Sequence, residues 1–392
     1  MSLAPVPRPE SPPAPPTGEP HRHMGYLDSM RALAALYVVV NHAFLQANWL
    51  YVWQHSRVEF FFLSLLSYGP AAVAVFIVLS GFCLTLPVIR HDGVLREGAG
   101  AFFLRRAWRI LPPYYVSIAL SLALIWLFIG EKTGTHWDTS LPVTTKGVVT
   151  HLLLVQDFFH ESATINHVLW SVAVEWRIYF IFPLLLIWWR KASPSVITTI
   201  MVTVSCAAAF ASEFAFGSPL HFHYFGLFTL GIFACGIAYS REDYYVRWQN
   251  LPWNGIVLVL TVVMLAANLI PWYHGGLLPL TIRDVIVGLW ASSFLVLTSR
   301  QPHAWHHRLL SFKPLVFVGT FAYSIYLIHA PLLQLFWQYA FQFLVPHPTR
   351  MLLALVLIGV PSILVASYVF FLLFELPFLH GRRKAAPTVK AV

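Results

Sequence analysis

An arginine and a histidine, Arg31 and His42, lie eleven positions apart in one apolar stretch of the chain. At 100° per residue this spacing nearly completes three helical turns, so both side chains lie on one face, about 16 Å apart along the axis. An ionisable side chain at membrane depth costs about 2.5–3.5 kcal/mol and usually faces a bundle interior or a wet cavity. The pair therefore predicts a buried polar site. A capping arginine and a hydrogen-bonded packing histidine are the structural alternative.

Three arginines follow in the motif Arg105-Arg106-Ala107-Trp108-Arg109. On a helix, Arg105 and Arg106 stand four and three residues before Arg109, so their guanidinium groups can converge on one face. Each guanidinium can bond two phosphate oxygens at once. The motif predicts a site for a cytoplasmic, phosphate-bearing donor. Topogenic positive charge with attraction to anionic lipid explains it equally well.

A polar stripe recurs at every fourth residue through His167, Ser171, Glu175 and Tyr179. Because the surrounding helix is apolar, this stripe must face inward. The Glu175 carboxylate can orient or polarise a histidine elsewhere in the bundle. A hydrogen-bonded packing network is the alternative reading of the same stripe.

A further set steps by three residues, through Tyr323, Tyr326 and His329. His329 is a second intramembrane histidine that can line the same cavity, and a satisfied structural histidine is the alternative. The small pair Ser80-Gly81 predicts close helix packing without a catalytic role.

The amino-acid composition indicates which class of protein holds these polar groups in place. Of the 392 residues, 58% are hydrophobic and only 10% are charged, against about 45–50% and about 25% in soluble chains. We therefore expect a multi-pass membrane protein whose partner is the lipid bilayer. The net charge of +9 reflects loop placement and does not indicate nucleic acid. The three cysteines lack metal-ligand spacing, so we expect neither disulfides nor a metal.

One crossing of a bilayer takes about 20 apolar residues in a helix, and ten apolar segments of the chain are long enough. They run approximately 31–50, 68–89, 111–130, 165–189, 195–215, 222–240, 251–271, 281–299, 314–336 and 351–374. Lys and Arg concentrate on one side of this arrangement if both termini are cytoplasmic. The predicted fold is an all-α bundle of about ten transmembrane helices in the cell inner (plasma) membrane.

The domain prediction is a Pro-rich disordered tail over 1–24, a transmembrane domain over 25–380 and a basic cytoplasmic tail over 381–392. The apolar run 148–159 is too short to cross. We expect it to form an interfacial or re-entrant helix that brings Gln156 and Asp157 near the site.

These motifs together resemble the membrane-bound acyltransferase-3 family. The resemblance covers about residues 24–380 in the family's order. It is carried by the Arg31 to His42 spacing and by the segments 76–82, 105–112, 169–183, 323–329 and 374–378.

The resemblance implies transfer of an acyl group to hydroxyls of extracytoplasmic glycans or of small molecules. The donor is most often acetyl-CoA. In the family, the histidine that matches His42 is regarded as catalytic and the arginine that matches Arg31 as its essential companion. The motif that matches Arg105 and Arg109 is associated with the CoA donor. Some members carry a C-terminal hydrolase-like domain, which we expect this chain to lack.

The residues and the resemblance suggest one mechanism as a hypothesis. Acyl-CoA binds with its phosphates on the three arginines, Arg105, Arg106 and Arg109, and its pantetheine arm extends toward His42. His42 then acts as general base, a role worth about 10²–10⁴ in rate, or as a nucleophile that carries the acyl group.

The other polar residues would support this chemistry. Arg31 and Glu175 orient and balance the charges, and Tyr179 or Tyr326 donates to the developing oxyanion. Ser171, Tyr323 and His329 are the further side chains expected to line the site.

A proton-coupled secondary transporter is the competing function, with His42, Glu175 and His329 as the relay. A scaffold subunit, in which none of these groups acts, is a third reading. The sequence leaves the acceptor, the acyl-chain length and the oligomeric state open.

Overall fold

The computed structural model describes residues 24–47, 66–216, 220–269 and 279–380, and this part of the chain is helical with no β-strand. The predicted all-α class is therefore confirmed. The two predicted tails lie outside the described residues, except for Met24.

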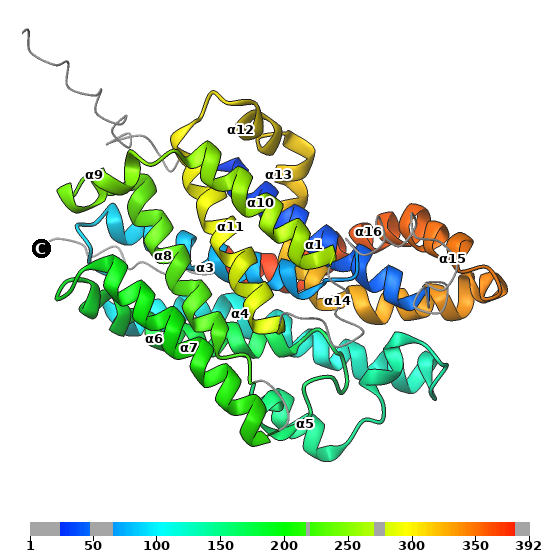
Figure 1. Cartoon of the computed structure of the whole chain (residues 1–392). Coiled ribbons are helices and arrows are strands. Elements are labelled where there is room, and N and C mark those ends of the chain that lie inside the picture. Colours follow the sequence, from blue (N-terminus) through cyan, green and yellow to red (C-terminus); the bar gives the residue numbers. More distant parts are fainter. Residues whose placement is uncertain (1–23, 48–65, 217–219, 270–278, 381–392) are drawn as a thin grey trace, which may run out of the picture.

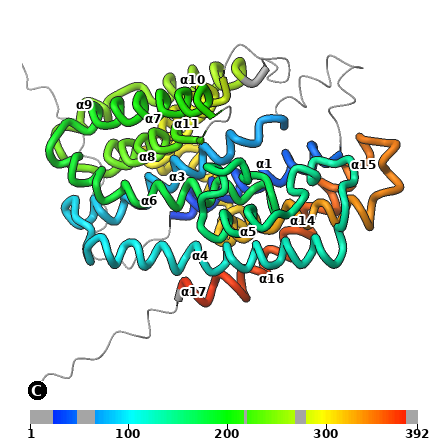
Figure 2. Tube along the Cα trace, turned by 90° about the horizontal axis from the view of Figure 1, so that it is seen from below, coloured from blue at the N-terminus to red at the C-terminus, as the bar shows by residue number. Residues whose placement is uncertain are grey.

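The helices form one elongated bundle (Figures 1 and 2). In chain order they are α1 (Gly25–Gln46), α3 (Pro70–Ile89), α4 (Gly98–Leu124), α5 (Thr145–Leu152), α6 (Trp170–Trp189), α7 (Pro194–Phe216), α8 (His223–Tyr239), α9 (Asp243–Gln249), α10 (Trp253–Leu269), α11 (Leu280–Arg300), α12 (Trp305–Leu310), α13 (Lys313–Thr320), α14 (Ala322–Leu335), α15 (Pro348–Ala354), α16 (Val360–Phe370) and α17 (Leu376–His380). Figure 2 shows α4 along one edge of the bundle beside α16 and α17, with α7, α8 and α10 at the opposite edge. The helices α1 and α14 run between these edges.

Short helical segments of other pitch complete the chain. The π-helical turns η2 (Ile125–Ile129), η8 (Leu355–Gly359) and η9 (Phe371–Glu375) extend α4 and join α15, α16 and α17 into continuous rods. The outer segments contain the 3₁₀ turns η3 (His136–Ser140) and η4 (Gln156–Phe159), and η6 (Phe336–Ala340) and η7 (Gln342–Leu344) follow α14.

Six of the described helices are long and apolar enough to cross a membrane, and two bent pairs raise the number to eight. The six are Pro70–Ile89, Gly98–Ile129, Trp170–Trp189, Pro194–Phe216, Leu280–Arg300 and Pro348–Leu379. The chain is thus a multi-pass membrane protein. The predicted count of ten spans is not confirmed, because α10 is shorter and α1 is not among the six.

Several helix boundaries differ from the predicted spans. Helix α1 begins at Gly25, so Arg31 lies inside the helix instead of at its start. Helix α4 begins at Gly98, and the arginine motif therefore lies on the helix that also forms a span. The segment predicted as 314–336 is broken between α13 and α14, which are bent by 73°. Helix α8 is likewise followed by α9 at 95°.

Helices α3 and α8 pack with their backbones in contact. A Cβ atom at Gly81 would lie 2.1 Å from the carbonyl oxygen of Phe228, and one at Gly231 would lie 2.0 Å from that of Val78. Neither position has room for a side chain, so the two glycines let the helix backbones touch. The close packing predicted for the Ser80-Gly81 pair is confirmed at Gly81, whereas Ser80 lines the cavity described below.

The predicted interfacial run forms α5 and η4. Gln156 is buried and donates to the carbonyl oxygen of Leu169 at 3.3 Å. Asp157 accepts a hydrogen bond of 2.8 Å from Arg177, within an ion pair. Both residues brace this segment against α6, and neither lines the cavity described next.

Candidate functional site

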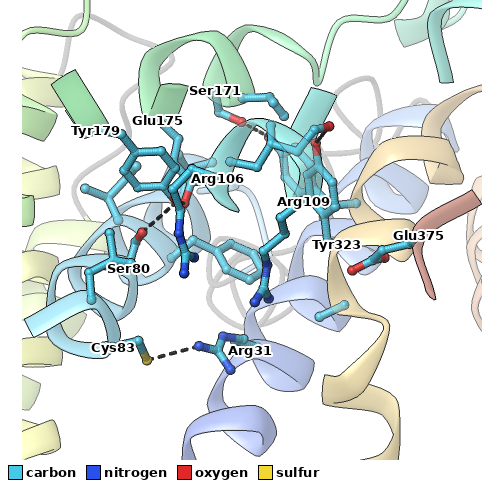
Figure 3. A pocket seen from close by; sticks show the side chains of 18 of the residues that line it. Arg31, Ser80, Cys83, Arg106, Arg109, Ser171, Glu175, Tyr179, Tyr323 and Glu375 are labelled. Carbon is cyan, nitrogen blue, oxygen red and sulfur yellow. Dashed lines mark hydrogen bonds between the residues drawn. The ribbon is translucent and has the colours of Figure 1, made fainter. Parts of the chain in front are cut away.

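A cavity of about 320 Å³ lies inside the bundle, between α1, α3, α4, α6, α13, α14 and η9 (Figure 3). This volume is within the range of small-molecule sites. Its polar lining combines cationic, anionic and hydroxyl groups: Arg31, Ser80, Cys83, Arg106, Arg109, Ser171, Glu175, Tyr179, Thr320, Tyr323, Tyr326 and Glu375.

Three guanidinium groups meet in this cavity. In Figure 3, Arg106 and Arg109 point from α4 toward Arg31 on α1. Arg31 donates to Asp28 Oδ1 at 2.6 Å and to Cys83 Sγ at 3.0 Å. Its charge is therefore balanced within α1, and Asp28 fixes its direction.

Arg106 and Arg109 have no such carboxylate partner. Neither forms an ion pair within the part of the chain that the structure describes. The Nε atom of Arg106 is buried without a hydrogen-bond acceptor. Arg109 is exposed, so the cost of a missing partner falls on Arg106: a buried guanidinium nitrogen without an acceptor is costly, and a bound anion would satisfy it.

Arg105 does not join this group, which corrects the expected convergence of all three arginines. Its side chain forms an ion pair with Glu97 just before α4 and does not line the cavity. Helical spacing predicts the face of the helix on which a residue lies, but not the direction of a long side chain. The ion pair with Glu97 holds the Arg105 side chain away from Arg106 and Arg109.

Three of the four stripe residues line the cavity as expected. Tyr179 donates its hydroxyl hydrogen to the Glu175 carboxylate. Ser80 lies 3.0 Å from the Tyr179 oxygen and, since that proton is already committed, is the donor in this pair. Ser171 lines the cavity one turn before Glu175. His167, the fourth member, precedes α6 and is not among the lining residues.

Two tyrosines of α14 also line the cavity. Tyr323 donates to the carbonyl oxygen of Ile110 at 3.1 Å. The Tyr326 hydroxyl donates to the carbonyl oxygen of Val168 at 2.9 Å and lies 2.6 Å from Ser171 Oγ. Both hydroxyls are thus held in place by α4 and by the start of α6.

Sequence reasoning did not place four of the polar side chains in the cavity: Ser80, Cys83, Thr320 and Glu375. Glu375 accepts a hydrogen bond of 2.6 Å from Ser324 and is 2% exposed. A carboxylate near the end of an apolar span was the available signal, although nothing in the chain placed it next to the others. Cys83 gave no signal beyond its apolar surroundings.

His42 lies beside this cavity and is not part of its lining. His329 Nδ1 lies 2.8 Å from the carbonyl oxygen of Tyr326 and 3.1 Å from that of Ile325. Since carbonyl oxygens only accept, His329 carries its proton on Nδ1 and its Nε2 is an acceptor. His42 Nδ1, at 2.7 Å from this Nε2, is then the donor. The lone pair of neutral His42 is on Nε2.

Two more imidazoles pack against His42. The ring centroid of His167 lies 5.0 Å from that of His42, and the centroid of His136 lies 5.7 Å away. His136 comes from η3, in an outer segment without periodicity, which explains why the sequence did not indicate it. Burial lowers the pKa of His136 to about 4, so this imidazole is neutral at physiological pH. We call these four residues, His42, His136, His167 and His329, the histidine cluster.

Tyr326 contacts both the cavity and the histidine cluster. Its side chain lines the cavity, and its ring centroid lies 5.8 Å from that of His329. The cavity with its arginines and Glu175 is thus linked to His42 through Tyr326 and His329.

Comparison with known proteins shows the family to which the chain belongs. The family model described as an acyltransferase domain (Acyl_transf_3) matches residues 24–372. Among curated proteins, the chain is 25% identical over 342 residues to the putative peptidoglycan O-acetyltransferase YrhL of Bacillus subtilis, covering 80% of this chain and 49% of that protein. The peptidoglycan O-acetyltransferase OatA of Listeria monocytogenes is 24% identical over 337 residues, covering 80% and 50%. The O-acetyltransferase OatA of Staphylococcus aureus is 24% identical over 339 residues, covering 80% and 51%.

The chain spans about half the length of the curated relatives it matches. No solved structure matches it. The family model covers most of the chain, including α1 with Arg31 and His42, the arginine motif and α14. On this match, the chain belongs to the acyltransferase-3 family of multi-pass membrane proteins.

Proposed function

We propose that this protein is an O-acetyltransferase of the cell inner (plasma) membrane that moves an acetyl group from cytoplasmic acetyl-CoA to a hydroxyl of an extracytoplasmic glycan. One observation carries the proposal: a cavity with two unpaired guanidinium groups lies next to an imidazole whose Nε2 lone pair is free. In a member of an acyltransferase family, these are the parts needed to hold an anionic donor and to activate a hydroxyl.

The donor's phosphates would bind to Arg106 and Arg109. Neither side chain forms an ion pair within the described residues, and a guanidinium holds phosphate in a bidentate manner. Arg31 would add a third cation while its pairing with Asp28 and Cys83 keeps it in position. The extended pantetheine arm would then lie along the cavity toward Ser171 and Tyr326.

The chemical step is the attack of the acceptor hydroxyl on the thioester carbonyl. As the oxygen–carbon bond forms, His42 Nε2 takes the hydroxyl proton and becomes an imidazolium, while Nδ1–H stays bonded to His329. The tetrahedral intermediate then breaks its carbon–sulfur bond. The departing thiolate takes the proton back from His42 and leaves as CoA-SH, and the acetyl ester remains on the acceptor.

The sequence left a second role open for His42, as a nucleophile that carries the acetyl group. The same Nε2 lone pair would attack the thioester carbonyl and expel the CoA thiolate, which leaves an acetyl-imidazolium. The acceptor hydroxyl would then take the acetyl group and restore neutral His42, while its proton goes to the thiolate to give CoA-SH. In both routes the thioester would have to reach His42 past Tyr326, which lines the cavity beside His329. Tyr179, whose hydroxyl hydrogen goes to Glu175 in this structure, would turn from Glu175 to donate to the carbonyl oxygen at the cavity end of this path.

The acceptor is proposed from the relatives. Two of them are named as peptidoglycan O-acetyltransferases, so we take a cell-wall glycan hydroxyl as the acceptor. No side chain of the described outer segments identifies the sugar.

The test is acetyl transfer by the full chain in membrane vesicles, with radiolabelled acetyl-CoA and a soluble peptidoglycan fragment as acceptor. We expect a labelled ester with the natural protein and a loss of about 10²–10⁴-fold in kcat in His42→Ala. His329→Gln, whose amide oxygen can still accept from His42 Nδ1–H, should retain more activity than His329→Ala. A rapid acid quench followed by mass spectrometry of the peptide with His42 separates the two routes, because only the nucleophile leaves an acetylated histidine. Undiminished transfer in His42→Ala, at equal protein level, contradicts the proposal.

A further inference from the structure

Three members of the histidine cluster form a group that the acetyl-transfer chemistry does not explain. His42, His136 and His167 each place one ring nitrogen within 4.8 Å of those of the other two. They come from α1, from η3 and from the turn before α6, so only the folded chain brings them together. The ring centroids of His136 and His167 lie 4.7 Å apart.

The hydrogen bonds of two of these rings leave one nitrogen of each free. His42 uses Nδ1 for His329, which leaves Nε2. His167 Nδ1 lies 3.1 Å from Ser140 Oγ, and its Nε2 is buried with no hydrogen-bond partner. A buried, unpaired imidazole nitrogen is costly. A cation that accepts lone pairs would satisfy both nitrogens at once.

The bonds on the far side of the rings are those of metal-binding histidines. A ligand histidine usually donates its other ring N–H to an oxygen or another acceptor, which fixes its tautomer and its direction. His42 has such a partner in His329, which is itself held by two backbone carbonyls. His167 Nδ1 faces Ser140 Oγ, which accepts from the His167 backbone N–H at 3.2 Å and can also accept from Nδ1–H when Nε2 binds a metal.

We propose that His42, His136 and His167 bind one divalent ion of the zinc class. Neutral imidazoles suit Zn²⁺, Cu²⁺ and Ni²⁺ and do not suit Mg²⁺ or Ca²⁺, which require oxygen ligands. Zn–N bonds of about 2.0–2.1 Å place the nitrogens of a tetrahedral site about 3.4 Å apart, so the ion would draw the three rings inward. Three protein ligands leave the fourth position for water.

The ion would bind to His42 Nε2, the nitrogen on which the proposed catalysis depends. Because His329 holds Nδ1 of His42, only Nε2 can bind the metal, and a metal-bound Nε2 accepts neither a proton nor an acyl group. Zinc at this site therefore inhibits transfer. This second part rests on the proposed function, whereas the binding of the ion does not.

The binding test uses the purified full chain in lipid nanodiscs and Zn²⁺ alone, followed by isothermal titration calorimetry. Substitution of Co²⁺ adds the visible absorption of a tetrahedral ion. We expect one site that His136→Gln weakens by at least about tenfold, with a smaller loss in Ser140→Ala, which removes a supporting partner. His347→Gln is the matched control, since it removes an exposed histidine outside the cluster. Equal zinc affinity in the natural protein and in His136→Gln overturns the proposal.

The inhibition test adds Zn²⁺ to the acetyl-transfer assay. We expect zinc to inhibit the natural protein and the His347→Gln variant, and to inhibit His136→Gln only at concentrations higher by the same factor as its loss of affinity. Zinc that binds through His136 without slowing transfer overturns the inhibitory role. If the natural protein transfers no acetyl group at all, the proposed function fails, and the calorimetry still decides the metal site.

Discussion

Arg105, Arg106 and Arg109 are of one residue type on one helix, yet their guanidinium groups have different surroundings. Arg105 forms an ion pair with Glu97, whereas Arg106 and Arg109 line the cavity without a carboxylate partner. Arg105 is therefore a control for substitutions of Arg106 and Arg109, since it lies on the same helix but outside the cavity.

We expect Arg106→Gln and Arg109→Gln to raise the KM for acetyl-CoA by about 10- to 100-fold, the value of one charge-assisted hydrogen bond to phosphate. Arg105→Gln should change this KM less than about threefold, since an exposed ion pair contributes little. The measurement is initial transfer rate against acetyl-CoA concentration in membranes of matched protein content. Equal effects of all three substitutions would mean that the motif acts through topology or lipid.

The residues of the site divide by how far apart they lie in the sequence. Ser171, Glu175 and Tyr179 were predictable as a lining set because a four-residue step fixes one face of one helix. Glu375 and His136 were not predictable, because they reach the site only through the packing of η9 and η3 against distant helices. The expected direction of Arg105 was wrong because helical phase leaves the side-chain torsions free.

At the scale of elements, the contact of α3 with α8 holds one wall of the cavity. Ser80 and Cys83 line the cavity from α3. Gly81, between them in the sequence, lies against the backbone carbonyl of Phe228 on α8. A change in the spacing of these two helices would therefore move Ser80 away from Tyr179.

We expect Gly81→Val to destabilise the protein by about 1–3 kcal/mol or more, because its side chain would overlap the backbone of α8. The melting temperature of the purified protein in detergent, followed by fluorescence, measures this effect. Gly255→Ala on α10 is the control: a Cβ atom there meets nothing within 4 Å, and alanine favours a helix. A melting temperature unchanged by Gly81→Val would exclude the tight crossing.

The positions of the helices were largely predictable, and their breaks were not. Long apolar runs identified the segments that became α3, α6, α7 and α11 to within a few residues, since burial in lipid requires such runs. The 73° bend between α13 and α14 has no comparable signal. Gly319 lies at this bend, where a Cβ atom would come within 2.0 Å of the Asp28 carbonyl oxygen. This close approach depends on α1, which is far away in sequence.

The outer surface of the whole molecule is apolar along much of its length. Trp126 and Phe214 are 87% and 96% exposed, which suits contact with lipid and not with water. This surface supports a membrane protein but does not give the number of crossings. The ten spans and the cytoplasmic termini stay predictions that rest on the distribution of Lys and Arg.

That topology predicts opposite labelling of two exposed positions, Thr139 and Arg247. In a chain whose three cysteines are replaced by serine, Thr139→Cys should react with a membrane-impermeant maleimide added to intact cells. Arg247→Cys should react only after the cells are broken. The degree of labelling is read on a gel by a mass shift. The reverse pattern would invert the orientation and place the arginine cavity on the wrong side for a cytoplasmic donor.

Tyr326 has a consequence for the cell as a whole. An open channel from Arg106 to His136 would let protons and sodium ions leak through and dissipate the membrane potential. Tyr326 lies between the cavity and His329, where the proposed transfer route would pass, and its hydroxyl is held by Ser171. A ring that leaves this place only during the proposed transfer would keep the bilayer electrically sealed and would keep water away from the thioester.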